Sequence, residues 1–425
     1  MRATPTDVLN VYWDADSEPL GEVLRKPSGN TVFRYFPGTN ESRRISHSLP
    51  VDGGVHDHPI TFFENLLPDG IQRERLARRL GVSDASAFSM LEVVGGDCAG
   101  ALSLLPVGRS PSLTVADLRP LDDGLLRTAL KQGVVPTAVT EGLRLSLAGA
   151  QDKLPVVLRD GKLWLPEGRA ASTHILKLPN RDFRGLVDNE HFLLELASEA
   201  GLPVIRSRLW ALPAGSESSH GLLVERFDRA DGRRLHQEDM CQATGSLPSR
   251  KYESDGGPSL LGLVAVLDAS STEPTDVVRL VRWQAFNIAT GNNDGHAKNV
   301  SLLREPAAHL APAYDLVCTR AWDALGKDIA FRVGGARDAG ATGPHAWAAF
   351  AEQARLSRKL VLDAAGDVST AVAERARLVA ERLTDEGGDA HAIRRALEQV
   401  EEHAQRALRL RVLEQEPRKR PRDRG

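Results

Sequence analysis

The chain is short of cysteine, of long apolar runs and of signal-like segments, and each shortage excludes a class of protein. Only three of its 425 residues are cysteines, without C-x-x-C spacing, which argues against a disulfide framework or a zinc site and fits a reducing compartment. No apolar run approaches the roughly 20 residues that a membrane span requires. The N-terminus lacks the apolar core of a signal peptide. We therefore expect a cytoplasmic protein that does not enter a membrane.

An excess of basic charge is also missing. The formal net charge is −3, so no general basic field attracts nucleic acid. A short basic run lies within the tail 416–425 and could touch nucleic acid, but such a run is more often a solvated, frayed end. The remaining composition, 41% hydrophobic and 26% charged, is ordinary for a globular protein of two or three domains.

The first part of the chain indicates a small unit of strands and one clear helix. Short strands are predicted within 8–35, separated by Asp, Pro and Gly turn signals. A helix is predicted over 71–80, with Gly81 at its C-terminal cap. A linker rich in proline, glycine and serine follows at 106–112. We take residues 1–108 as the first structural unit.

The remainder indicates a strand-rich segment and then a helical one. Residues 140–245 are strand-rich, and Asp160-Gly161 is a strong hairpin signal between two of the strands. Residues 246–415 are dominated by amphipathic helix patterns. The expected fold is α+β, with two lobes as in protein kinases. The strand-rich N-terminal lobe would carry an extra N-terminal subdomain, and the C-terminal lobe would be all-helical.

Three polar residues in the helical part have the order that phosphoryl transfer by kinases requires. Asp294 precedes Asn299 by five positions, as in the kinase catalytic loop, and Asp315 follows. Asp294 would be the catalytic carboxylate that accepts the substrate hydroxyl proton, and Asn299 and Asp315 would hold Mg²⁺. A polar turn after a helix would explain Asp294 alone. The full trio favours catalysis.

Two further residues of this loop are assigned to the nucleotide site. His296 is expected to brace the loop, and Lys298 to meet a phosphate or a nearby carboxylate. A metal-hydrolase site built from Asp294, His296 and His309 is disfavoured, because no second close pair of ligands accompanies them.

The strand-rich segment supplies candidates for binding ATP. Lys177 ends a probable buried strand and needs an anionic partner, either phosphate or Glu190 on the next helix. An edge-strand lysine facing water is the alternative, and Glu190 could instead serve the helix dipole in a first turn. Glu225 and Phe227 follow an apolar strand and are hinge candidates for the adenine, or simply a strand end.

A small-residue turn before the hairpin is a candidate phosphate-binding loop, since its N–H groups could approach phosphate oxygens. Taken alone the signal is weak, because one glycine between two alanines is more often ordinary packing. The loop and its flank contain, in order, Ser146, Leu147, Ala148, Gly149, Ala150, Gln151, Asp152 and Lys153.

With these residues in view, the chain resembles the HipA family of serine/threonine kinase toxins. The resemblance rests on motifs in order over nearly the whole chain. They are 62–70, 95–102, 146–153, 174–177, 224–229, 236–243, 252–258, 291–299 and 313–315.

The resemblance implies a kinase that depends on ATP and Mg²⁺ and arrests growth. It implies a helix-turn-helix antitoxin of the HipB type as partner, contact with DNA only through that antitoxin, and a protein substrate such as an aminoacyl-tRNA synthetase. Lys177 would contact ATP, the loop from Leu147 to Lys153 would bind phosphate, and Ser146 would be autophosphorylated as an off-switch. Added phosphate charge beside such a loop would disable ATP binding.

Two other functions stay open at this point. The chain could phosphorylate a small molecule or lipid, because the motifs do not name the acceptor. It could also be a non-catalytic partner of the antitoxin and DNA. The complete set Lys177, Asp294, Asn299 and Asp315 argues against the non-catalytic function.

Overall fold

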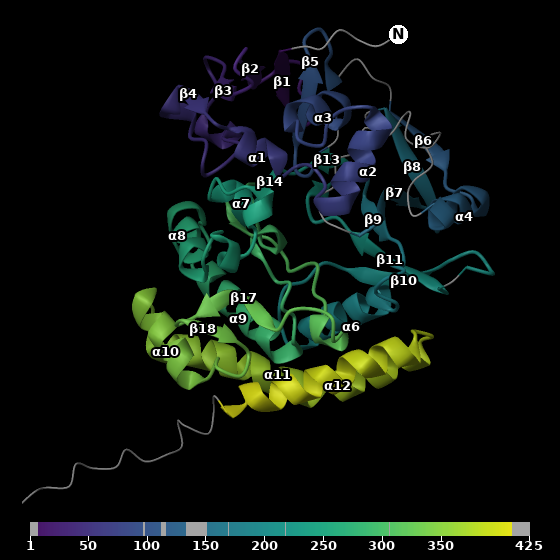
Figure 1. Cartoon of the computed structure of the whole chain (residues 1–425), viewed down its shortest axis with the longest axis vertical. Helices are drawn as coiled ribbons and strands as arrows, with labels where there is room; N and C mark the ends of the chain where they lie inside the picture. Colours follow the sequence, from purple (N-terminus) through teal and green to yellow (C-terminus); the bar gives the residue numbers. More distant parts are fainter. Residues whose placement is uncertain are drawn as a thin grey trace, which may run out of the picture.

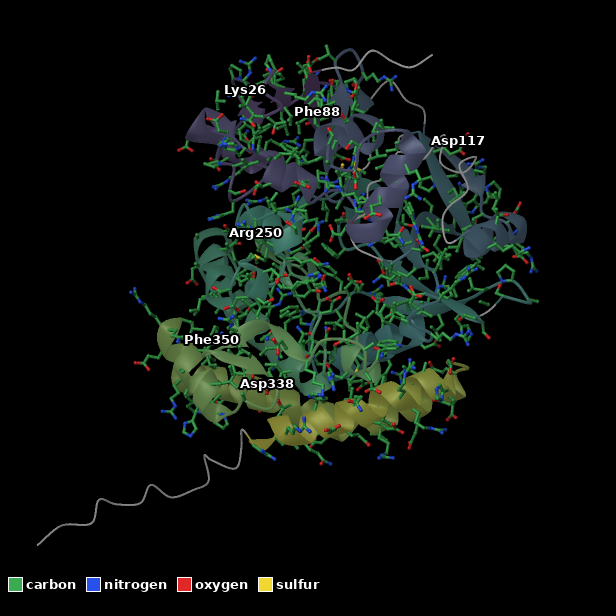
Figure 2. The ribbon with its side chains drawn as sticks, in the orientation of Figure 1. Lys26, Phe88, Asp117, Arg250, Asp338 and Phe350 are labelled. Atoms are coloured by element: carbon green, nitrogen blue, oxygen red, sulfur yellow. The ribbon has the colours of Figure 1, made fainter. Side chains whose placement is uncertain are left out.

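The computed structural model describes residues 7–96, 98–111, 116–132, 151–168, 170–216, 218–305 and 307–409. The first unit lies at one end of the molecule, and the long helices α11 (Arg358–Asp385) and α12 (Ala390–Ala407) lie at the other (Figure 1). Side chains fill the interior between these ends (Figure 2). Within the described ranges, no helix is long and apolar enough to cross a membrane.

The first unit is an antiparallel five-stranded sheet packed against short helices. The sheet order is β4-β3-β2-β1-β5. Its strands are β1 (Val8–Trp13), β2 (Gly21–Arg25), β3 (Thr31–Tyr35), β4 (Val55–Asp57) and β5 (Leu102–Pro106), and its helices are α1 (Ile60–Glu64), α2 (Gly70–Leu80) and α3 (Ala87–Val94). The strands and helix predicted within 8–35 and 71–80 are confirmed, and Gly81 caps α2 in the left-handed region. Phenylalanines from sheet and helices share one core.

The second sheet has six strands in the order β10-β11-β9-β7-β8-β6. Its strands are β6 (Ala116–Pro120), β7 (Lys153–Arg159), β8 (Lys162–Gly168), β9 (His174–Lys177), β10 (Ser207–Ala211) and β11 (His220–Glu225). The predicted hairpin is confirmed: Arg159 pairs with Lys162, and both Asp160 and Gly161 have positive φ, as a tight primed turn requires. Helix α4 (Asp123–Gln132) precedes the hairpin, and α6 (Leu186–Glu199) follows β9.

Helix α6 joins the sheet to the helical part of the chain. It packs against β10 and β11 on one side and against α11 and α12 on the other. The helix begins at Leu186, so Glu190 is its fifth residue and lies beyond the first turn. The helix dipole therefore gives a weaker account of Glu190 than the sequence suggested.

The helical part surrounds the largest hydrophobic core. Its helices are α7 (Met240–Ala243), α8 (Leu260–Ser270), α9 (Asp276–Thr290), α10 (Pro344–Gln353), α11 (Arg358–Asp385) and α12 (Ala390–Ala407). Helix α9 directly precedes the loop that carries Asp294 and Asn299, and Gly291 ends the helix with a left-handed cap.

The two-lobed α+β fold is confirmed, but the C-terminal lobe is not all-helical. Small antiparallel sheets interrupt it, formed by β15 (Ser301–Leu303), β16 (His309–Leu310), β17 (Asp328–Val333) and β18 (Ala336–Asp338). Strand β15 also pairs with β14 (Gln237–Asp239), and a further hairpin joins β12 (Arg229–Ala230) to β13 (Arg233–Arg234). The expectation failed because strands this short carry too little periodicity to outweigh the surrounding helix patterns.

Candidate active site

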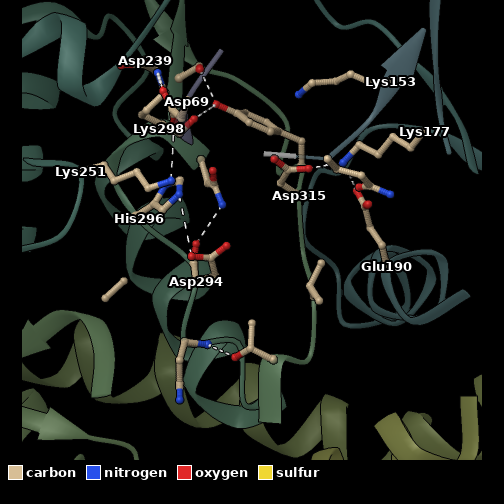
Figure 3. A pocket seen from close by; sticks show the side chains of 18 of the residues that line it. Asp69, Lys153, Lys177, Glu190, Asp239, Lys251, Asp294, His296, Lys298 and Asp315 are labelled. Carbon is tan, nitrogen blue, oxygen red and sulfur yellow. Dashed lines mark hydrogen bonds and ion pairs between the residues drawn. The ribbon is translucent and has the colours of Figure 1, made fainter. Parts of the chain in front are cut away.

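A cavity of about 780 Å³ lies between the six-stranded sheet and the loop after α9. Sheet, catalytic loop and first unit all contribute to its wall. Among the predicted site residues, the lining includes Gln151, Lys153, Lys177, Glu190, Glu225, Phe227, Asp294, His296, Lys298, Asn299 and Asp315. Figure 3 shows Lys153, Lys177 and Glu190 on one side of this space and Asp294 on the other. Gln151 and Asp315, which are 164 positions apart in the sequence, therefore face one cavity.

Lys177 lies between two carboxylates. It is the last residue of β9, and its Nζ donates to Glu190 Oε1 at 2.6 Å and also to Asp315 Oδ1. The side chains of Lys177 and Glu190 are 7% and 1% exposed, which excludes an edge-strand lysine facing water. Burial alone would lower the pKa of Lys177, but the two carboxylates raise it, so the amine stays charged.

The two carboxylates are held in different electrostatic states. Burial raises the pKa of Glu190 to about 7, with Lys177 opposing the shift. Burial would also raise the pKa of Asp315, but Lys177 and Lys153 hold it well below its ordinary value. Asp315 is thus kept ionised on the cavity wall, as a metal-binding carboxylate must be.

Asp294 lies in the tight loop after α9. A Cβ at Gly291 would come within 2.8 Å of the Arg320 side chain, so this left-handed position requires glycine. The Asp294 carboxylate accepts a hydrogen bond from Tyr252 Oη through Oδ1. Its side chain is 53% exposed, yet the surrounding protein removes enough water to raise the pKa of its carboxyl, and the Tyr252 hydrogen bond opposes that shift. A reactant in the cavity can therefore reach this carboxylate.

Asn299 and Asp315 offer a donor set that fits Mg²⁺. The Asn299 amide nitrogen donates to the Asp294 carbonyl at 3.0 Å, which leaves the amide oxygen as its metal-binding atom. Asp315 has a φ of 54°, an uncommon conformation outside glycine that turns up at functional sites. In the described part of the chain, no group of three or more His, Cys, Asp or Glu side chains could hold a metal. One carboxylate and one amide oxygen suit Mg²⁺, which keeps several waters and binds substrate phosphates.

The predicted phosphate-binding loop is only partly described. Ser146, Leu147, Ala148, Gly149 and Ala150 lie outside the described residues. Beyond them, Gln151 Nε2 donates to the Leu178 carbonyl at 2.9 Å, and Asp152 Oδ1 accepts from Gln72 Nε2 at 2.8 Å.

Lys153 follows at the start of β7 and lines the cavity near Lys177 and Asp315. Burial lowers the pKa of Lys153 to about 8, with Asp315 opposing the shift. A bound phosphate would restore its full charge.

The hinge candidates lie at the end of β11. Glu225 is the last residue of the strand, and its side chain is 49% exposed. Phe227 stacks on Tyr314 with ring centroids 5.4 Å apart, which places an apolar surface on the cavity wall. Both positions are available to a planar base.

Lys298 is anchored on the first unit, which the sequence did not predict. Its Nζ donates to the Asn65 carbonyl at 3.1 Å and to Asn65 Oδ1 at 3.2 Å, and it lies 3.4 Å from Asp69 Oδ1. Asp69 Oδ2 is also 3.6 Å from Lys251 Nζ. Asn65 and Asp69 therefore line the cavity although they belong to a motif more than 220 residues before the catalytic loop. Only the motif resemblance over 62–70 marked this segment.

His296 lies inside the loop as expected for a bracing residue. Its side chain is 7% exposed, and its Nε2 is 3.9 Å from Asp294 Oδ1. Burial keeps the pKa of its imidazole well below the ordinary value, so the ring is neutral.

Comparisons with known proteins support one family over most of the chain. Residues 145–376 match the HipA-like C-terminal domain, and residues 9–105 match the HipA N-terminal domain. The Sinorhizobium fredii protein Y4mE, whose name describes it as a kinase, is 38% identical over 402 residues. These residues cover 89% of this chain and 93% of that protein. The serine/threonine-protein kinase toxin HipA of Shewanella oneidensis is 30% identical over 339 residues, covering 75% and 76%.

A solved structure shows the same architecture. The Shewanella oneidensis complex of HipA, HipB and operator DNA contains a chain with a TM-score of 0.79 and 26% identity. The match covers 94% of this chain and 99% of the other. The first unit, the sheet and the helical part therefore recur together in that structure.

Proposed function

The chain belongs to the HipA family of serine/threonine kinase toxins, and we propose that it transfers the γ-phosphate of ATP to a serine or threonine hydroxyl of a protein. The observation that carries this proposal is the gathering of Lys177, Asp294, Asn299 and Asp315 around one cavity. Kinase chemistry needs these groups together and little covalent chemistry from the protein.

Each residue has a defined task in this transfer. Lys177, fixed by Glu190, would bind the nucleotide phosphates, and Lys153 would add a second cation beside it. Phe227 would cover the adenine face near Glu225. Asn299 and Asp315 would hold Mg²⁺, which neutralises charge on the phosphates when bound. The acceptor oxygen would form a bond to the γ-phosphorus as the bond to the β–γ bridging oxygen breaks, and Asp294 would take the hydroxyl proton.

Lys298 and His296 would act mainly on the loop. Lys298 is bonded to Asn65 and Asp69, so it would support the catalytic loop more directly than it would contact ATP. His296 would hold the loop in place through its contact with Asp294.

The biological setting is proposed from the family. The target would be a translation component such as an aminoacyl-tRNA synthetase, and a HipB-like helix-turn-helix antitoxin would neutralise the kinase and carry it to DNA. The complex of Shewanella oneidensis, which contains HipA, HipB and operator DNA, supports this partnership. Autophosphorylation of Ser146 would switch the enzyme off by adding charge beside the phosphate loop. Three domains, 1–108, 140–245 and 246–415, with a basic tail at 416–425, would form the functional chain.

Incubation of the purified protein with γ-labelled ATP and Mg²⁺ tests the proposal. Wild type should label itself and a protein in a cell lysate, and Asp294→Asn should lower the rate about 100- to 10,000-fold. Ser146→Ala should abolish the self-label but keep the transfer to the lysate protein. Absence of any label would overturn the kinase function. Label confined to a lipid or small-molecule fraction would favour that acceptor class instead.

A further inference from the structure

We propose that Tyr252 is a positioning residue for Asp294. Its hydroxyl occupies the Oδ1 atom of the Asp294 carboxylate and leaves Oδ2 for the acceptor hydroxyl. This inference rests on the proposed kinase function and names a residue that its catalytic set does not contain. Tyr252 opens the segment 252–258, whose function the sequence left open.

The contacts around Asp294 are strongly one-sided. Tyr252 Oη donates to Oδ1, and His296 Nε2 lies 3.9 Å from the same oxygen. The Tyr252 and His296 rings meet edge to face with centroids 5.1 Å apart. Lys251 Nζ lies 5.6 Å from the Tyr252 ring centroid. Two rings thus enclose Oδ1, and an acceptor hydroxyl meets less obstruction at the other oxygen.

The chemistry of the phenol suits a permanent donor. Burial and the Asp294 carboxylate both raise the pKa of Tyr252 far above its ordinary value, so the phenol keeps its proton at any physiological pH. A donated hydrogen bond to the carboxylate favours its ionised form and fixes its rotation about the Cβ–Cγ bond. Both effects help a group that must accept a proton from one direction.

The backbone around Tyr252 is pinned to the elements that carry the site. The Lys251 carbonyl accepts from Ala297 N at 3.1 Å, inside the catalytic loop. Glu253 Oε2 accepts from Arg332 N at 2.8 Å, on β17. Gly257 N donates to the Tyr252 carbonyl at 3.0 Å, and a Cβ at Gly257 would lie 1.9 Å from the Arg250 carbonyl oxygen, so this closely packed turn requires glycine.

This pinning decides between two roles for the phenol. A mobile tyrosine on Asp294 would be a placeholder that the acceptor must displace. A tyrosine fixed from both sides instead shares the carboxylate with the acceptor. The structure favours the fixed role, and the two roles predict opposite effects when the hydroxyl is removed.

The test is Tyr252→Phe, which keeps the ring and removes the hydrogen bond. We expect kcat to fall about 10- to 100-fold, because loss of orientation at a reacting group has effects of this size. The KM values for ATP and for the protein acceptor should stay unchanged. Tyr12→Phe is the matched control, because the Tyr12 hydroxyl donates to the Arg109 carbonyl at 2.8 Å in the first unit, away from the cavity. Its kcat should equal that of wild type.

An unchanged or higher kcat in Tyr252→Phe, or a lower KM for the acceptor, would overturn the inference in favour of a placeholder. Lack of transfer by wild type itself would instead contradict the proposed function. The contact is then checked without activity by a cycle of unfolding midpoints for Tyr252→Phe, Asp294→Ala and the double variant. Non-additive shifts support the contact, and additive shifts contradict it.

Discussion

Lys177 and Lys298 are both buried cations on the wall of one cavity, but they are anchored in different ways. Lys177 is held by the carboxylates of Glu190 and Asp315, which belong to the two lobes of the kinase fold. Lys298 is held chiefly by two neutral oxygens of Asn65, with Asp69 at 3.4 Å, all from the first unit. The first arrangement keeps a charged amine on the cavity wall, as the proposed binding of phosphate requires. The second connects the first unit to the loop that carries Asp294.

The difference shows that the burial of a lysine does not by itself reveal the function of that lysine. Burial requires an anionic or polar partner, and either kind of anchor satisfies that requirement. Only the partner distinguishes a lysine that binds substrate from one that supports a loop. The following predictions test this distinction at both lysines and at the interface of the first unit.

Replacement of Lys177 by methionine should have the largest effect. Glu190, which is buried, and Asp315, which is partly exposed, would lose their cation, and breaking the buried Lys177–Glu190 pair costs about 3–5 kcal/mol of unfolding free energy. Loss of the phosphate-binding cation should also lower transfer by at least about 100-fold. Denaturant unfolding and initial rates measure the two effects. A variant with wild-type ATP affinity would contradict the assignment of Lys177.

Asp69→Asn should have a smaller effect that falls on catalysis. The substitution removes the charge beside Lys298 and Lys251, so the catalytic loop should be held less firmly and kcat should fall about 10-fold. The affinity for ATP should stay unchanged, as measured by equilibrium titration. Asp57→Asn is the control in the same unit, because Asp57 forms an exposed ion pair with Lys26. Equal rates for the two variants would show that the first unit does not support the loop.

A pH effect at the interface of the first unit should be the smallest of the three near neutral pH. Burial lowers the pKa of His236 to about 3, and its Nε2 contacts the Ile45 carbonyl at 2.7 Å. An unfolded histidine titrates near 6.5, so between about pH 6.5 and 3 the unfolded chain binds more protons than the folded one. Stability should therefore be complete above pH 6.5 and fall as the pH drops through this window.

His236→Gln should flatten that acid slope when unfolding midpoints are measured from pH 7 to 4. The exposed His391 provides the control, since His391→Gln should leave the slope as it is in wild type. A slope that survives His236→Gln would assign the acid sensitivity to other groups.

Local signals predicted much of the fold. The Asp160-Gly161 turn specified its hairpin, and Gly81 ended its helix where expected, because glycine adopts the left-handed conformation without strain. No such local signal predicted the short strands β15 to β18. They are stable only as partners of one another and of β14, so nothing within each segment distinguishes it from a loop or a helix end.

The candidate site divides in the same way. The offset between Asp294 and Asn299 is local, and the loop after α9 brings the amide of one to the carbonyl of the other at 3.0 Å. The contact of Lys177 with Asp315 joins residues 138 positions apart, and the sequence did not predict it, because only phosphate and Glu190 were expected as partners of Lys177. No requirement of kinase chemistry pointed to Tyr252 or Asn65.

The amino-acid sequence by itself determined the class of chemistry, because the spacing of the two aspartates, the asparagine and the lysine is a property of the chain itself. The tertiary structure alone decided that Asn65 and Asp69 reach Lys298 and that Tyr252 takes one oxygen of Asp294. The physical reason is that these contacts arise where separate elements pack together. Their geometry depends on the shape of the whole core, and no local pattern of residues encodes it.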